Sequence, residues 1–480
     1  MTDNTHTQMH SQIYDRWNAS ALPTLHEYIR IPNKSPVFDE SWEANGYMDQ
    51  AARMLCDWAQ TADIEGMQLE VFKLPGRTPI IFAEIPDSNG VNNPTDPTVL
   101  LYGHYDKQPE FAGWREDLDP WVPHEEDGKL YGRGGADDGY AIFASLLSIE
   151  AMRQHGRPHP RCVMLIEGCE ESGSFDLPAY VEAKKDRIGQ AELVICLDAE
   201  CGDYDRLWVT TSLRGMLPGV LRVKMMNEGQ HSGAAGGVVP STFRILRHLM
   251  ERVEKAADGS LHEVLHAEIP EQAQEDANKM AQVLGTAFTD KYPWVEGAGP
   301  GDLDPSEHML ANAWKPSMET VGISGAPEVE NAGNTLRPET VVKLVFRLPP
   351  TLEAEPAAAQ IKEILETDPP YGAEVTFDLE HPQTGWRAPT EAPWLTRALQ
   401  GASSRFFGRE VMYMGTGGTI PFMNMLGDAY PNTQFFVTGV LGPNSNAHGP
   451  NEFLHIETAR RLTCCVTHVL EAAWSEFAQR

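Results

Sequence analysis

Side chains that can bind metal ions recur along this chain, mostly just after short apolar runs. They are, in chain order, His104 and Asp106, Asp137 and Asp138, Glu170 and Glu171, Asp198 and, far downstream, His448. Imidazole nitrogen combined with carboxylate oxygen suits zinc, with manganese or cobalt as alternatives. No cysteine belongs to these groups, which excludes a structural zinc finger. The set therefore predicts a hydrolase site that holds two metal ions.

The spacing within each group suits such a site. On an extended segment, His104 and Asp106 point the same way, so the histidine can bind metal while the aspartate orients the ring. Asp137 ends a glycine-rich turn that enters a helix, and its two oxygens could bridge two ions. Of the adjacent acids Glu170 and Glu171, one can bind metal and the other can act as general base.

The two remaining groups are less specific. Asp198 closes an apolar run, and Glu200 is the competing ligand if the loop is shifted. His448 stands in a loop rich in Gly, Asn and Pro, where a single histidine is usually a surface residue. Each group alone also fits a helix cap or a solvated acidic loop. Only the ordered set favours a metal site.

The first half of the chain predicts the elements that position these groups. Apolar runs predict buried strands, and apolar residues at helical spacing predict helices between them, with Asp176 as an N-cap. The strands are expected at 98–102, 161–166 and 193–197, and the helices at 140–153 and 176–187. This alternation predicts an α/β fold with a mixed, mostly parallel sheet and helices on both faces. The candidate ligands follow the strands, where ligands of such sheets bind.

The middle of the chain has a different pattern. Strands are expected at 215–225, 340–348 and 373–379, helices at 240–256 and 355–366, and a polar stretch at 259–316. This predicts a smaller α+β domain with an antiparallel sheet. A further strand at 434–440 and His448 look like a return to the first domain. We therefore expect a catalytic domain formed by 1–212 and 384–480, interrupted by a second domain at 213–383.

Composition narrows the classes of partner. The 480 residues carry a formal net charge of −31, which argues against nucleic acid or an anionic membrane surface as partner. No apolar run is long enough to span a membrane, and the polar first ten residues lack a signal core, so we expect a cytoplasmic location. The seven cysteines form no CxxC pair and are expected to be reduced and buried, although Cys169 beside the glutamate pair could sense oxidation.

Taken together, the motifs resemble the dinuclear zinc exopeptidase family of carnosinases, cytosolic nonspecific dipeptidases, aminoacylases and glutamate carboxypeptidases. The resemblance runs from Leu100 to about Glu452 and is strongest to the carnosinase-like dipeptidase branch. It rests on His104-x-Asp106, Gly132-Arg133-Gly134-x-x-Asp137-Asp138, Glu167-Gly168-x-Glu170-Glu171-Ser172-Gly173-Ser174, Asp198, and His448 followed by Asn451-Glu452. Two departures concern substrate preference more than catalysis: Gly139 replaces a common lysine, and Cys169 precedes the glutamate pair.

The resemblance implies a role for each residue. His104 and Asp198 would bind one zinc ion, Glu171 and His448 the other, and Asp137 would bridge them. Glu170 would be the general base, and Asp106 would support the site near His104. The interrupting domain would be a lid that forms a homodimer, with His231 completing the partner's site and stabilising the oxyanion. Arg347 would grip a substrate carboxylate, and Gly417, Gly418 and Thr419 would contact the substrate terminus.

The function expected on this basis is hydrolysis of dipeptides or short peptides with a free carboxylate. Aspartate at position 198 favours the dipeptidase reading, because deacylases and carboxypeptidases of the family tend to have glutamate there. Two alternatives stay open: hydrolysis of N-acyl amino acids by a deacylase or carboxypeptidase, and metal or peptide binding without catalysis. A phosphoesterase is disfavoured because no basic phosphate clamp stands near the motifs.

Overall fold

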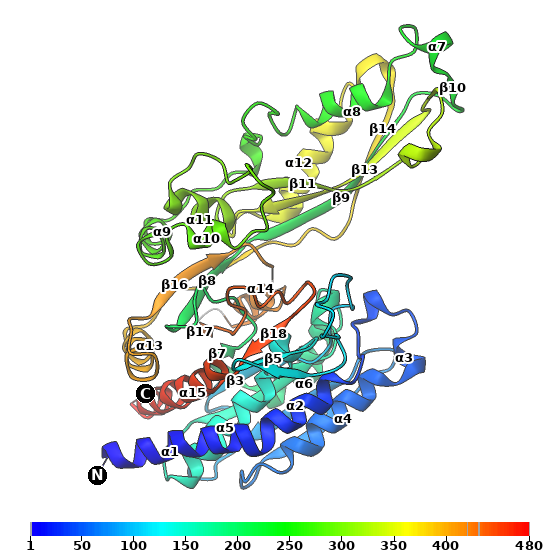
Figure 1. The fold of residues 1–480 in the computed structure, drawn as a ribbon. Helices are drawn as coiled ribbons and strands as arrows, with labels where there is room; N and C mark the ends of the chain where they lie inside the picture. Colours follow the sequence, from blue (N-terminus) through cyan, green and yellow to red (C-terminus); the bar gives the residue numbers. More distant parts are fainter. Residues whose placement is uncertain (1, 420, 431–432, 480) are drawn as a thin grey trace.

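A six-stranded sheet forms the centre of the larger part of the molecule (Figure 1), in a computed structural model that describes residues 2–419, 421–430 and 433–479. Its strands are, in spatial order, β1 (Gln68–Phe72), β2 (Ile80–Ile85), β6 (Arg161–Glu167), β3 (Pro97–His104), β7 (Gln190–Cys196) and β17 (Gln434–Val437). The β6–β3, β3–β7 and β7–β17 pairs are parallel, whereas β1–β2 and β2–β6 are antiparallel. The predicted mixed, mostly parallel sheet is confirmed.

Helices cover both faces of this sheet because its strands are apolar on both sides. In β3, Val99 and Leu101 belong to one buried cluster, and Leu100 and Tyr102 belong to the other. The first face is covered by α1 (Thr2–Arg16), α2 (Leu22–Ile29), α4 (Tyr47–Ala59), α5 (Ala141–Gln154), α13 (Pro393–Phe406) and α15 (Ile456–Phe477). The second face is covered by α6 (Leu177–Ile188) and α14 (Pro421–Ala429). β3 is therefore buried from Thr98 to its carboxyl end at His104.

The smaller part contains a four-stranded antiparallel sheet with helices on one face (Figure 1). Its order is β11 (Ser317–Ser324), β13 (Glu339–Leu348), β9 (Gly215–Lys224) and β14 (Glu374–Leu379). Alternate residues of β13 pack with α8 (Thr242–Met250) and α12 (Ala354–Glu366). Arg347 therefore lies on the opposite face of the strand, between the buried Phe346 and Leu348.

A third, three-stranded sheet joins the two parts. It consists of β15 (Trp386–Arg387), β8 (Trp208–Leu213) and β16 (Met412–Thr416), and β8 leads directly into β9. The stretch read as polar at 259–316 contains α9 (Glu271–Leu284), α10 (Ala287–Asp290) and α11 (Pro305–Ala313). Met280 and Met309 of this stretch pack with Trp208 and Met414. The helices therefore bury their apolar side against the joining sheet. The domain limits at 212 and 384 stay a prediction.

Some expected elements differ in detail. The helix expected at 240–256 is the shorter α8, and Asp176 does not cap α6 with its side chain. Instead, the Asp176 carboxylate accepts hydrogen bonds from Arg77 and from Thr78. The shorter elements are α3 (Trp42–Asn45), α7 (Ser232–Ala235), β4 (His124–Glu126), β5 (Lys129–Tyr131), β10 (Gln230–His231), β12 (Thr335–Leu336) and β18 (Phe453–His455).

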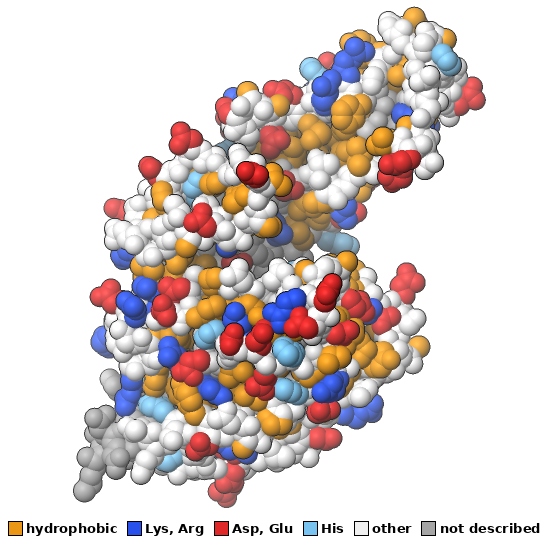
Figure 2. Space-filling view, viewed as in Figure 1, with side chains coloured by type: hydrophobic (Ala, Val, Ile, Leu, Met, Phe, Trp, Pro, Cys, Tyr) orange, Lys and Arg blue, Asp and Glu red, His pale blue; other side chains and the backbone are white. Residues whose placement is uncertain are grey.

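The space-filling view shows the molecule hollowed between its two parts (Figure 2). In the ribbon, the joining sheet lies at one end of this hollow, and β10 and α7 lie at the far tip of the smaller part (Figure 1). Within the described ranges, no helix is both long and apolar enough to cross a membrane.

Candidate metal centre

The carboxyl ends of three neighbouring strands bring most of the candidate ligands together. His104 is the last residue of β3, and Asp198 follows β7. Glu170 and Glu171 form a short 3₁₀ turn after β6. Because β6, β3 and β7 run parallel in this order, the residues that follow them meet at one edge of the sheet.

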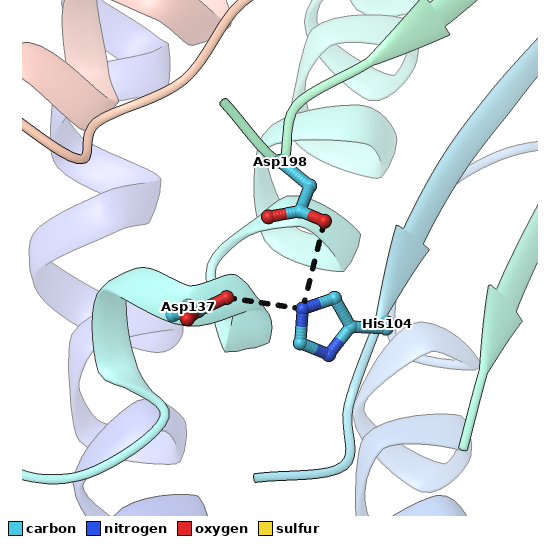
Figure 3. Close-up of side chains that lie close together, drawn as sticks. All are labelled: His104, Asp137 and Asp198. Atoms are coloured by element: carbon cyan, nitrogen blue, oxygen red, sulfur yellow. Dashed lines mark hydrogen bonds and ion pairs between the residues drawn. The ribbon is translucent and has the colours of Figure 1, made fainter. Parts of the chain in front are cut away.

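The first cluster consists of His104, Asp137 and Asp198 (Figure 3). His104 Nε2 lies 3.1 Å from Asp137 Oδ1 and 3.7 Å from Asp198 Oδ2. All three side chains are buried. One nitrogen therefore faces two carboxylates in a space shielded from water.

The second cluster consists of Asp137, Glu171 and His448. His448 Nε2 lies 3.0 Å from Asp137 Oδ2 and 3.3 Å from Glu171 Oε2. Asp137 thus directs one carboxylate oxygen toward each histidine. In each cluster the candidate ligand atoms lie within 4.8 Å of one another.

The charge of the site fits a cation. Glu171 is largely buried, and its Oε1 accepts no hydrogen bond from the described residues. Burial and the negative charge of Asp137 raise the pKa of Glu171 well above its ordinary value. Burial raises the pKa of Asp198 to about 6, with Asp137 contributing. Buried carboxylates at such close range are costly without a compensating positive charge, which metal ions would supply.

Asp106 organises both His104 and the glutamate turn. His104 Nδ1 lies 3.1 Å from the Asp106 backbone oxygen and 3.4 Å from Asp106 Oδ1, which leaves Nε2 facing the cluster. Burial acts to lower the pKa of His104, but Asp198, Asp106 and Asp137 outweigh it and hold that pKa well above its ordinary value. The two Asp106 oxygens accept 3.0 Å hydrogen bonds from the backbone N–H groups of Glu170 and Glu171.

Glu452 holds the loop that carries Asp137. The sequence motifs include this residue, but they did not predict this role. Its buried carboxylate accepts hydrogen bonds from the N–H groups of Gly134, at 2.9 Å, and Ala136, at 3.1 Å. It also accepts a 2.8 Å hydrogen bond from Nη1 of the buried Arg133. The signal available in the sequence was the Asn451-Glu452 pair after His448.

Arg133 extends this network to the second cluster. Its guanidinium donates to the backbone oxygens of Ala447 and Gly449, which flank His448 in the chain. The Arg133–Glu452 pair therefore links the turn of Asp137 to the loop of His448, although the two segments are far apart in sequence.

Other predicted site residues lie elsewhere. His231 is exposed in β10 at the far tip of the smaller part, well away from β3 and β7 in Figure 1. Arg347 Nη1 donates a 3.2 Å hydrogen bond to Thr419 Oγ1, so these two predicted residues meet. Gly417 and Gly418 precede Thr419, whereas Ile420 of the same segment lies outside the described residues.

Comparison with known proteins identifies the family. The model of peptidase family M20/M25/M40 matches residues 100–472, most of the chain. The chain belongs to this peptidase family. The resemblance inferred from the motifs is thereby confirmed.

Relatives of this M20 peptidase carry dipeptidase names. It is 25% identical over 417 residues to the cysteinylglycine-S-conjugate dipeptidase of Corynebacterium striatum, covering 83% of this chain and 87% of that protein. It is 28% identical over 297 residues to the Beta-Ala-His dipeptidase of Homo sapiens, covering 60% of this chain and 56% of that protein. The di-peptidase Dug1p of Saccharomyces cerevisiae shares its fold, with a TM-score of 0.76, 20% identity and 98% of each chain covered.

One departure of this M20 peptidase has a steric cause. A Cβ atom at Gly139 would lie 2.4 Å from Tyr28 Cε1 and 2.5 Å from the Gly134 backbone oxygen, so no side chain fits there. Lys107 lies nearby and is buried. Its Nζ donates 2.8 Å hydrogen bonds to the backbone oxygens of Tyr28 and Ile31.

The structure also bears on two alternatives that the sequence left open. Glu200 forms a bridge with Leu441 and belongs to neither cluster, whereas Asp198 does. Cys169 is buried, and burial followed by the charge of Glu167 raises the pKa of its thiol. The reactive thiolate is therefore disfavoured, which weighs against a redox role.

Proposed function

We propose that the protein is a metal-dependent dipeptidase that hydrolyses the amide bond of dipeptides or short peptides with a free carboxylate. The observation that carries this proposal is Asp137, which directs its two oxygens toward His104 and His448. The family membership and the dipeptidase names of the relatives support the same activity.

In this proposal the two clusters hold two zinc ions, with manganese or cobalt as alternatives. His104 and Asp198 would bind one ion, Glu171 and His448 would bind the other, and Asp137 would bridge them. Metal ions held in this way make water a stronger nucleophile and polarise the scissile carbonyl.

Glu170 acts as general base in this scheme. It takes a proton from the attacking water and returns it to the leaving amine. Burial and the negative charge of Asp198 raise the pKa of Glu170 well above its ordinary value, a perturbation that is common at acid–base sites. Asp106 fixes the Glu170 backbone and thereby the reach of its carboxylate.

We further propose a homodimer in which the lid at 213–383 supplies His231 to the partner's site. Two observations support this arrangement. First, His231 is exposed at the tip of the smaller part, away from the metal clusters of its own chain. Second, β11 is an edge strand with exposed Val321 and Ile323. An uncovered apolar edge strand favours pairing with a second copy. The cytoplasmic location stays a prediction.

The decisive experiment is a panel of dipeptides and N-acetyl amino acids assayed with protein reconstituted with zinc, manganese or cobalt. The proposal expects dipeptides to be hydrolysed and N-acetyl amino acids to be poor substrates. Faster hydrolysis of the N-acetyl compounds would establish the deacylase alternative. Stoichiometric metal binding without hydrolysis of any amide would establish the non-catalytic one.

A further inference from the structure

Arg214 is a buried arginine for which neither the motifs nor the proposed mechanism accounts. It lies between β8 and β9, where the chain enters the smaller part, and is 8% exposed. Its Nε has no hydrogen-bond partner among the described residues. Its Nη1 contacts are long, at 3.3 Å to Lys315 O and 3.4 Å to Ser317 Oγ. Among the residues that the structure describes, no carboxylate lies within ion-pair distance of this guanidinium.

Arg214 and Arg347 are neighbours. Thr419 Oγ1 accepts a hydrogen bond from Arg347 Nη1 and donates one of 2.6 Å to the Arg214 backbone oxygen. Ser317, whose Oγ contacts Arg214, pairs with Arg347 in the β11–β13 register. Burial first, and then the positive charge of Arg347, lower the pKa of Arg214 to about 10. The two guanidinium groups therefore lie close enough to repel each other.

The adjacent loop leaves room for the Arg214 side chain. A Cβ atom at Gly417 would lie 2.9 Å from Arg214 Nη2, so a larger residue there would press on the guanidinium. This gives the predicted glycine-rich segment a physical reason: Gly417 accommodates Arg214, and Thr419 joins it to Arg347.

Arg214 also lies near the loop that follows β7. Glu200, two residues beyond Asp198, is near enough for its charge to act on Arg214. β8, which ends beside Arg214, lies against β17, the neighbour of β7 in the central sheet. Arg214 thus lies where the joining sheet meets the smaller part, and Arg347 lies beside it on β13.

Arg214 is buried and Arg347 is partly buried, and among the described residues neither has a carboxylate within ion-pair distance. Two such neighbouring cations are unfavourable unless a ligand brings negative charge. Arginine presents a planar fork that matches a carboxylate with two parallel hydrogen bonds. One substrate carboxylate would neutralise one of the two guanidinium groups, and a second carboxylate would neutralise both.

We propose that Arg214 is a second carboxylate-binding arginine and that it selects dipeptides whose C-terminal residue is acidic. Arg347 binds the C-terminal carboxylate, and Arg214 binds the side-chain carboxylate of a C-terminal aspartate or glutamate. The inference rests on the proposed dipeptidase function and specifies its substrate class.

The test compares substrates of nearly equal shape: Ala-Glu with Ala-Gln, and Ala-Asp with Ala-Asn, on the metal-loaded full-length protein. A charge-assisted hydrogen-bond pair predicts that kcat/KM for the acidic member exceeds that for the amide by about tenfold or more. Arg214→Met should bring this ratio close to one by raising KM for the acidic substrate, while the amide substrate is affected little.

The control is Arg222→Met, which removes a partly exposed arginine of β9 that pairs with Glu339. It should leave the substrate ratio unchanged. Equal kcat/KM for acidic and amide substrates in the wild type would overturn the inference, as would Arg214→Met lowering both equally. If Arg214→Met does not fold, Arg214→Gln decides: glutamine keeps polar hydrogen-bonding groups but carries no charge, so a wild-type ratio would overturn the inference. Hydrolysis of none of these dipeptides would instead contradict the proposed function itself.

Discussion

Arg133 and Glu452 form a fully buried ion pair, with Nη1 2.8 Å from Oε2, between the turn that carries Asp137 and the loop that carries His448. Side chains far apart in sequence thus hold the two candidate ligands of one metal position. Because the pair is buried, removing one partner leaves a charge that the surroundings cannot solvate.

Replacing Arg133 by methionine should therefore weaken both the fold and the site. We expect the free energy of unfolding to fall by about 3–5 kcal/mol, the usual cost of leaving one buried charge unpaired. Urea unfolding measures this loss. Arg115→Met, which removes a surface arginine paired with Asp117 and Glu126, is the control and should cost about 1 kcal/mol or less. Equal losses in the two variants would contradict the proposed importance of the buried pair.

Glu452→Gln should lower metal affinity with a smaller effect on stability. The amide cannot accept the hydrogen bonds from Arg133 and from the N–H groups of Gly134, Ala136 and Asp137 as strongly as the carboxylate does. Loss of such support costs about 10–100-fold in metal affinity. Competition with a chromophoric chelator would measure the affinity, with the exposed Glu410→Gln as control. Unchanged zinc affinity would argue that the Asp137 turn keeps its shape without the carboxylate.

Glu170→Gln separates metal binding from proton transfer. Since Glu170 belongs to neither ligand cluster, the variant should keep both ions while kcat falls by about 10²–10⁴-fold. Glu171→Gln, its neighbour in the same turn, should instead lose metal. Metal content and kcat are measured on the same preparations. Wild-type turnover in Glu170→Gln would exclude it as the general base.

Mixing two inactive variants tests whether His231 acts across a dimer. In a mixed dimer of His231→Ala and Glu170→Gln chains, one site has an intact Glu170 and receives His231 from the other chain. Random exchange should restore roughly a quarter of wild-type activity, because half of the dimers are mixed and each has one complete site. Exchange is followed with differently tagged chains. No recovery after demonstrated exchange would rule out this role.

His159 should make stability fall in acid. It is buried, its Nε2 accepts a 3.0 Å hydrogen bond from Arg153, and burial lowers its pKa to about 4. Below its ordinary pKa the unfolded chain takes up a proton that the folded chain refuses, so its contribution is present above pH 6.5 and lost as pH falls. The expected loss between pH 6.5 and 4 is up to about 3 kcal/mol.

Urea unfolding across this pH range, on wild type and His159→Gln, measures that contribution. The variant lacks the titrating group, so its stability should fall less steeply as the pH is lowered. Parallel curves for the two proteins would show that His159 is not responsible.

The sequence pattern predicted the three central strands β3, β6 and β7 well, because each is largely a single apolar run, whereas β1 and β2 were not predicted. The strands around Leu101, Leu165 and Ile195 differ from expectation only at their ends. The stretch 259–316 was harder to interpret, since its helices bury a narrow apolar side against a sheet formed by distant residues. Asp176 was misread for a similar reason: its partners Arg77 and Thr78 come from elsewhere in the chain.

By itself, the sequence determined the chemical types of the candidate ligands and their positions after successive strands, because side-chain chemistry and strand periodicity are local properties. Only the tertiary structure decided that Asp198 rather than Glu200 faces His104, and that Glu452 supports the Asp137 turn. It alone placed Arg214 beside Arg347. A single arginine between two strands carries no local signal, and its burial and missing partner arise only when distant segments pack around it.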